Sequence, residues 1–79
     1  MTQNDLLQVL RHQPFEPFRL HLSDGTAFEI HHPDQCSVGL TTAHVGVPRR
    51  EGRRRFQEVV ICSLRHITRL EPLVEMAKR

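Results

Sequence analysis

The chain has 79 residues, of which 38% are hydrophobic and 25% charged, with a formal net charge of +2 and two cysteines. This length predicts one domain, and no apolar run of about 18 residues is present that would span a bilayer. The polar N-terminus differs from a signal peptide, so we expect a cytoplasmic protein whose Cys36 and Cys62, set among apolar neighbours, are buried free thiols.

The first segment, residues 1–13, is predicted to form a helix. Thr2 is placed to cap its start, and Asp5 falls in the first turn, where a carboxylate is favourable. An apolar stripe at helical spacing consists of Leu6, Leu7, Val9 and Leu10. Pro14 is expected to end the helix and to begin a stiff, extended approach to the first strand.

The stretch FRLHLSDGTAFEI, residues 18–30, predicts a hairpin of two short strands. A three-residue loop at residues 23–25, with Gly25 in the left-handed conformation, gives the favoured register. That register opposes Leu22 and Thr26, Leu20 and Phe28, Phe18 and Ile30, and Arg19 and Glu29. One face of the hairpin is then apolar, while the other carries an exposed ion pair.

The stretch CSVGLTTAHVGV, residues 36–47, alternates in polarity before a Thr-Thr interruption and predicts one bent strand or two short ones. Gly39 and Gly46 within it indicate bulges or a close approach to the backbone. The arginine-rich stretch VPRREGRRRF, residues 47–56, is predicted to be a loop. It contains five arginines and one glutamate, so positive charge is concentrated there.

A further strand is predicted to begin at Phe56. Because residues 59–62 are apolar on both faces of this strand, we expect it to be central in its sheet. A sharp turn at SLRHI and a last short strand at TRLEP follow. This strand carries Arg69 and Glu71 on one face, where they are expected to form an ion pair or to protect a sheet edge.

Together these elements predict an α+β fold in which one N-terminal helix packs on a small, strongly bent, five-stranded antiparallel sheet. The single domain, residues 1–79, is expected to comprise the helix at 1–13, a small barrel at 14–72 and a tail at 73–79. Because so short a chain buries a small core and a partly open sheet leaves free edges, we also expect a homo-oligomer.

Four segments, PFEPF, SDG, HP and HITRLEP, resemble the pattern of a group of short bacterial proteins that carries no established activity. A weaker resemblance, in FRLHLSDGTAFEI and VVICSLRHITRLEP, is to the bacterial Sm-like RNA chaperone family and other SH3-like small barrels. The resemblance implies an Sm-like barrel. It also implies RNA contacts at Arg65 and His66, which stand where that family has a Lys-His pair.

The arginine-rich stretch is the strongest functional candidate, because Arg–phosphate contacts supply much of the affinity for nucleic acids. The stretch is compatible with binding to RNA or DNA, with binding to an acidic protein surface, and with a solvated loop that has no partner. The candidate contacts are Arg49, Arg50, Arg53, Arg54 and Arg55, with Arg65 and His66. We therefore favour a non-enzymatic binding module; the alternative is a module for self-assembly or protein–protein interaction with no nucleic-acid role.

No metal site, cofactor, small-molecule substrate or enzyme activity is expected. His31, His32 and Asp34 are close in the sequence, but neighbouring residues of a strand point to opposite faces, so His21 and His31 are interpreted as polar-face residues beside Arg19 and Glu29. The cysteines lie in apolar patterns, where burial suppresses thiol reactivity. The carboxylates are scattered singly, so no acid–base pair stands out.

Overall fold

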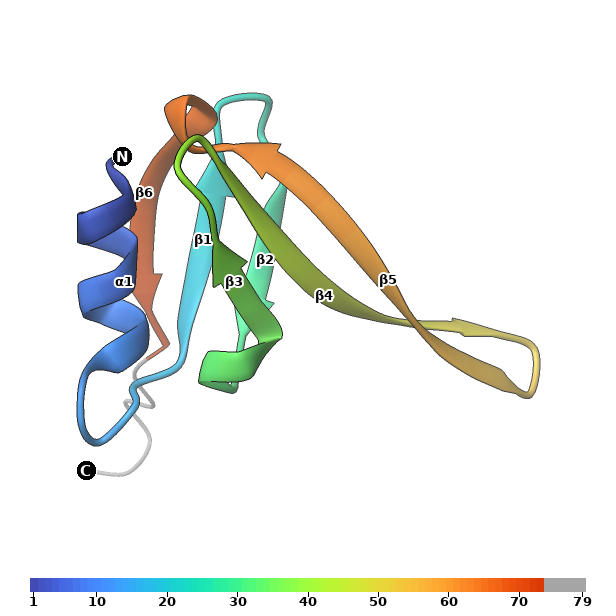
Figure 1. The fold of residues 1–79 in the computed structure, drawn as a ribbon. Helices are drawn as coiled ribbons and strands as arrows, with labels where there is room; N and C mark the ends of the chain where they lie inside the picture. The colour runs from blue at the N-terminus through green and yellow to red at the C-terminus, as the bar shows by residue number, and fades with distance from the viewer. Residues whose placement is uncertain (74–79) are drawn as a thin grey trace.

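The computed structural model describes residues 1–73, which form an α+β fold of one α-helix and two three-stranded antiparallel sheets (Figure 1). In chain order the elements are α1 (Gln3–Arg11), β1 (Phe18–Leu22), β2 (Ala27–Ile30), the 3₁₀ helix η1 (Pro33–Gln35), β3 (Cys36–Val38), β4 (Thr42–Glu51), β5 (Arg54–Ser63), the 3₁₀ helix η2 (Leu64–His66) and β6 (Ile67–Pro72). The strand orders are β2-β1-β6 and β3-β4-β5. Residues 74–79, most of the predicted tail, lie outside the described part.

The prediction of a single, strongly bent five-stranded sheet of the Sm-like or SH3-like barrel kind is wrong. The chain leaves one sheet for the other at η1 and again at η2, and within residues 1–73 no strand pairing closes the two sheets into a barrel. Pro33 begins η1 and has no N–H to donate to a ladder, which ends the first sheet there. At η2, the Ser63 hydroxyl accepts a hydrogen bond from the Arg65 N–H at 3.3 Å and stabilises the bend.

Helix α1 forms where the sequence predicts it. Thr2 and Asp5 make a capping box: the Asp5 N–H donates to the Thr2 hydroxyl at 3.1 Å, and the Thr2 N–H donates to the Asp5 carboxylate at 3.2 Å. Leu6 and Leu10 are buried on the side that faces the sheets. With nine residues the helix is far shorter than the roughly 20 that cross a bilayer, and no helix among residues 1–73 is long and apolar enough to do so.

The core lies between the two sheets and α1. Its buried members come from α1, from every strand and from η2, and they are Leu6, Leu10, Phe18, Leu20, Ile30, Cys36, Ala43, Val45, Cys62, Leu64 and Ile67. Both cysteines are buried and free, as predicted. Burial, with Cys62 nearby, raises the pKa of the Cys36 thiol to about 11, and burial also raises the pKa of the Cys62 thiol, so both remain protonated.

The β1–β2 hairpin has the predicted register. Phe18 faces Ile30, Leu20 faces Phe28 and Arg19 faces Glu29, while the Leu22 N–H donates to the Thr26 carbonyl at 2.9 Å. Gly25 has a φ of +93°, and its N–H donates to the Leu22 carbonyl at 3.1 Å, as expected for a type I turn followed by a glycine bulge. The Asp24 carboxylate accepts from the N–H and hydroxyl of Thr26, which lowers its pKa and keeps it charged.

Gly25→Val is expected to lower the free energy of unfolding by about 2 kcal/mol, because a β-branched residue is strained at positive φ. Urea denaturation followed by circular dichroism measures this loss. Gly39→Ala is the matched control: Gly39 is not at positive φ, and an added Cβ would meet the Thr42 carbonyl at an ordinary 3.5 Å. Equal losses in both variants would contradict the strained-turn explanation.

The second part of the sheet prediction is right in one respect and wrong in another. Residues 36–47 form two strands, β3 and the start of β4, which is one of the two predicted alternatives. However, β5 is an edge strand rather than a central one, and its apolar residues are covered on one face only. Cys62 is buried, whereas Val59 and Ile61 on the opposite face are 61% and 62% exposed.

Candidate nucleic-acid interface

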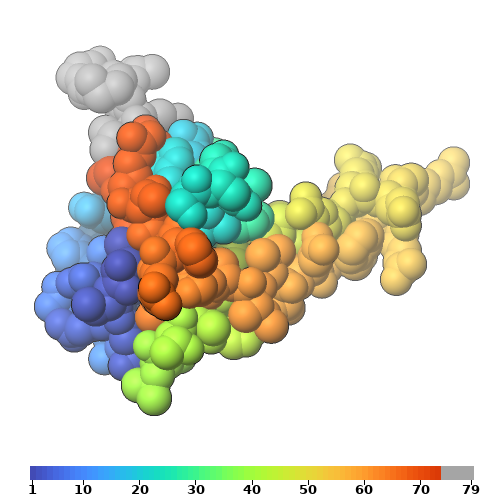
Figure 2. All heavy atoms as spheres, turned by 90° about the horizontal axis from the view of Figure 1, so that it is seen from above, coloured from blue at the N-terminus to red at the C-terminus, as the bar shows by residue number. Residues whose placement is uncertain are grey.

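The arginine-rich stretch is not a loop but the outer half of a long β-hairpin. Pairing of β4 with β5 continues beyond the core, from Pro48 opposite Gln57 to Glu51 opposite Arg54. We call residues 48–57 the arm. Every residue of the arm is exposed, and it projects from one side of the body as a two-stranded ribbon (Figures 1 and 2). Arginine is compatible with an exposed strand, so charge alone did not distinguish a loop from a ribbon.

The tip of the arm is a two-residue turn formed by Gly52 and Arg53. Gly52 has a φ of +61°, and no residue other than glycine has positive φ within residues 1–73, so the turn has the type II′ pattern with glycine at its first central position. Type II′ turns match the twist of two antiparallel strands. Gly52 within the Glu-Gly-Arg-Arg stretch therefore indicates a hairpin turn, which the charge pattern alone does not reveal.

Side chains alternate between the two faces of the arm, and one face is internally compensated. Arg49 donates through Nε to the Glu58 carboxylate at 2.6 Å. The Arg54 guanidinium lies 5.3 Å from the centre of the Phe56 ring, within cation–π distance. Both arginines therefore already have partners on this face, although their side chains remain accessible to solvent.

The opposite face of the arm is uncompensated. Arg50 and Arg55 lie directly opposite each other across the two strands, and no described carboxylate forms an ion pair with either. Like charges placed in this way destabilise a strand pair, whereas an anion bound between them relieves the repulsion. Arg53, at the tip, is also exposed. This face thus presents a concentrated positive charge to solvent.

Arg65 and His66 are not brought together with the arm. They lie in η2, at the other end of β5, and a ten-residue strand separates them from the arm tip by about 30 Å. The His66 ring nitrogen Nδ1 is 3.2 Å from the Ser23 hydroxyl, and the His66 carbonyl accepts from the Ser23 N–H at 2.8 Å. The residues that the family resemblance implied and those that the charge pattern indicated therefore form separate surfaces.

The base of the arm is held against the first sheet. The Gln35 side chain accepts from the His31 N–H at 2.8 Å and donates to the carbonyls of Glu29 at 2.8 Å and Gly46 at 2.9 Å. The Gln57 side-chain amide occupies the space where a side chain at position 46 would begin, so the predicted close approach at Gly46 is confirmed. A groove of about 730 Å³ lies beside this junction, between β2, η1 and the arm.

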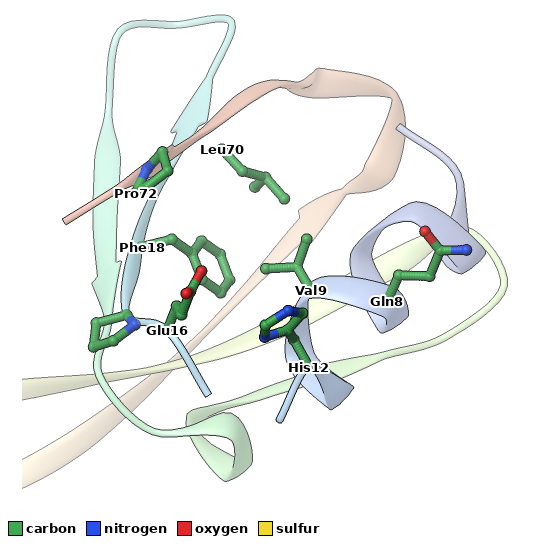
Figure 3. Close-up of a pocket in the computed structure, with 8 residues that line it drawn as sticks. Gln8, Val9, His12, Glu16, Phe18, Leu70 and Pro72 are labelled. Carbon is green, nitrogen blue, oxygen red and sulfur yellow. The ribbon is translucent and has the colours of Figure 1, made fainter. Parts of the chain in front are cut away.

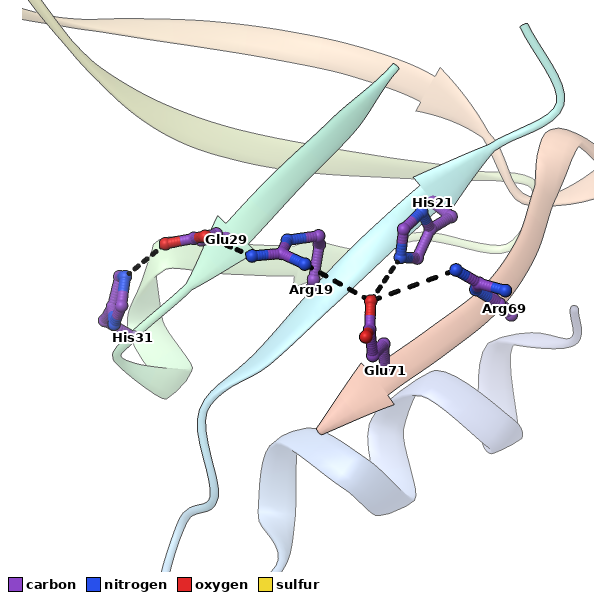
Figure 4. Close-up of polar contacts among 6 residues, drawn as sticks. All are labelled: Arg19, His21, Glu29, His31, Arg69 and Glu71. Atoms are coloured by element: carbon purple, nitrogen blue, oxygen red, sulfur yellow. Dashed lines mark hydrogen bonds and ion pairs between the residues drawn. The ribbon is translucent and has the colours of Figure 1, made fainter. Parts of the chain in front are cut away.

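A second polar surface covers the outer face of the β2-β1-β6 sheet (Figure 4). Arg19 contacts Glu29 at 2.7 Å and Glu71 at 3.3 Å. His21 contacts Glu71 at 2.9 Å, His31 contacts Glu29 at 3.2 Å and Arg69 lies 3.9 Å from Glu71. These contacts confirm the predicted polar face.

The two carboxylates of this polar surface are held in the charged form. The pKa of Glu29 is lowered chiefly by its hydrogen bond with Arg19, and the pKa of Glu71 is lowered chiefly by its hydrogen bond with His21. Because positive and negative groups are interleaved across the sheet, the network joins the three strands and leaves no concentrated charge of one sign.

An apolar pocket of about 330 Å³ lies between α1 and β6, with Val9, Phe18 and Leu70 around it (Figure 3). Its ionisable side chains are His12 and Glu16, and the His12 Nδ1 is already 3.0 Å from the Pro14 carbonyl. Within residues 1–73 no group of three or more His, Cys, Asp or Glu side chains is arranged to hold a metal ion. The uncompensated face of the arm is thus the candidate site with the clearest chemistry.

Comparisons with known proteins identify no relative of this chain. No protein-family model, no curated protein and no solved structure matches this chain.

Proposed function

We propose that this protein is a non-enzymatic module that binds nucleic acid through the arginines of its arm. The observation that carries the proposal is the cross-strand pair Arg50 and Arg55, two guanidinium groups on one face without a carboxylate partner among the described residues. Guanidinium groups bind phosphate oxygens through paired N–H donors, so adjacent arginines suit the repeating phosphates of a nucleic-acid backbone. Arg53 at the tip extends the same positive surface.

The shape of the arm favours duplex DNA over a single strand. The major groove of B-DNA is about 12 Å wide and admits a two-stranded β-ribbon. Proteins that bind single strands set aromatic side chains beside the positive charge so that bases stack on them. The arm has one aromatic residue, Phe56, which is 39% exposed and lies beneath the guanidinium of Arg54.

An Arg50→Ser/Arg55→Ser variant is expected to bind a 20-base-pair DNA duplex about 50-fold more weakly than the unmodified protein at 0.1 M NaCl. Each lost phosphate contact reduces the slope of log K against log salt by about 0.9, so the slope should flatten by about 2. Fluorescence anisotropy between 50 and 200 mM NaCl measures both quantities, and a single-stranded RNA of equal length tests the choice of a duplex.

The matched control is Arg11→Ser/Arg69→Ser, which removes the same charge from exposed positions on α1 and β6. We expect this control to keep the salt slope of the unmodified protein. Equal losses in the two variants would show that only net charge matters and would reject the arm as the binding surface. Absence of salt-dependent binding to DNA and RNA would reject the proposal and favour an acidic protein partner.

A further inference from the structure

The free edge of β5 is a surface that nucleic-acid binding does not use. β5 is the last strand of the β3-β4-β5 sheet, and a pocket of about 560 Å³ separates the body end of its free edge from Leu22, Thr26 and Phe28 of the β1–β2 hairpin. Val59 and Ile61 are 61% and 62% exposed on its outer face, while Val60 is half-buried on the inner one. A short, uncharged and apolar edge therefore lies between the arm and η2.

Such an edge is normally protected, because its unpaired N–H and C=O groups are able to pair with another strand. Proteins protect exposed edges with charged side chains, prolines, bulges or covering segments. The segment from Val59 to Ser63 contains no charge and no proline, and its pairing with β4 is regular. The body half of β5 thus has no charge, proline or bulge to protect its edge, in contrast to the arginine-rich arm half.

We propose that two copies of this chain pair through their β5 edges, antiparallel and about a two-fold axis at Val60, and so join two three-stranded sheets into one of six strands. In this register Val59 of each copy lies opposite Ile61 of the other, and Val60 lies opposite its own counterpart. The exposed apolar side chains then cover one another, and the free backbone groups of both edges are paired.

The residues along β5 favour this register over the two that lie nearer the arm. Moving the axis one residue toward the arm, to Val59, leaves Ile61 opposite Gln57, and moving it to Glu58 sets two carboxylates opposite each other, which is unfavourable. With the axis at Val60, the overlap runs from Gln57 to Ser63 and includes no arginine. The antiparallel arrangement also sends the two arms to opposite ends, so their arginines do not repel each other and remain available.

A second copy also suits the size of this chain. At 79 residues it buries a small core, and association increases the buried apolar surface of a short domain. A seam of one strand from each copy is smaller than a standard interface of about 1,600 Å², so the dimer is expected to be weak and concentration-dependent.

Analytical ultracentrifugation of the nuclease-treated protein over about 5–500 μM tests this pairing without nucleic acid. The unmodified chain should shift from monomer to dimer across that range. Val59→Lys/Ile61→Lys should remain monomeric with an unchanged circular dichroism spectrum, since both side chains are exposed in the single copy. Leu40→Lys, at a position 83% exposed in the turn between β3 and β4, should dimerise as the unmodified chain does.

Cysteine cross-linking tests the register. A mixture of Val59→Cys and Ile61→Cys proteins should form disulfide-linked dimers under mild oxidation, whereas each variant alone should form few, because equivalent positions are then too far apart. A monomer at every concentration, or a dimer that Val59→Lys/Ile61→Lys leaves intact, would overturn the proposal. Because every arm arginine is retained, loss of dimerisation is separable from loss of DNA binding.

Discussion

Leu20→Ala is expected to lower the free energy of unfolding by about 3–5 kcal/mol. Leu20 is 0% exposed and lies in β1, the central strand of the β2-β1-β6 sheet, opposite Phe28 on one side and Leu70 on the other. Truncating it removes buried methyl groups where neighbouring strands on both sides limit relaxation, so a cavity remains. A domain of this length is stable by about 4–12 kcal/mol, and the loss is therefore a large part of the total.

Leu40→Ala is the matched control for this substitution. Leu40 is 83% exposed, so the same chemical change is expected to alter the free energy of unfolding by less than about 0.5 kcal/mol. Urea denaturation, followed by circular dichroism at equal protein concentration, compares the two variants. Similar losses in both would contradict the placement of the core between the sheets.

Removing the arm is expected to abolish nucleic-acid binding while the body stays folded. The variant joins Val47 to Glu58, which pair directly in the hairpin, through Asn-Gly in place of residues 48–57. Asn-Gly favours the two-residue turn that this junction needs. Because no buried core residue lies in the deleted segment, the free energy of unfolding should change by about 1 kcal/mol or less.

The same deletion removes all five arm arginines, so affinity for the DNA duplex should fall by about 1,000-fold or more at 0.1 M NaCl. Anisotropy measures the affinity, and urea denaturation confirms that the body is folded. A folded deletion variant that still bound DNA within tenfold of the unmodified chain would place the interface on the body, for which Arg65 and His66 in η2 are the remaining candidates.

The elements that the sequence predicted well depend on local signals. The capping box formed by Thr2 and Asp5 sets the start of α1, and it spans only four consecutive residues. Gly25 sets the β1–β2 register, because the loop length and the left-handed conformation together leave one pairing that separates apolar from polar side chains. In both cases the information lies within a few residues of the structure that it determines.

The elements that the sequence predicted poorly depend on what covers each face. The apolar residues Val59 and Ile61 are typical of a central strand, but only the topology shows that their face is bare. The five candidate arginines of the arm do lie together, yet their strand geometry separates compensated Arg49 and Arg54 from uncompensated Arg50 and Arg55. A linear charge count does not distinguish these two faces.

The three hydrogen bonds of the Gln35 side chain have a mechanical consequence. They connect the end of β2 to β4 at Gly46, which lies just before the arm begins at Pro48. These bonds hold the base of the ribbon against the β2-β1-β6 sheet, so bending at this junction has to break them. In the proposed complex, the angle at which the ribbon enters a groove would therefore also set the position of the body on the duplex.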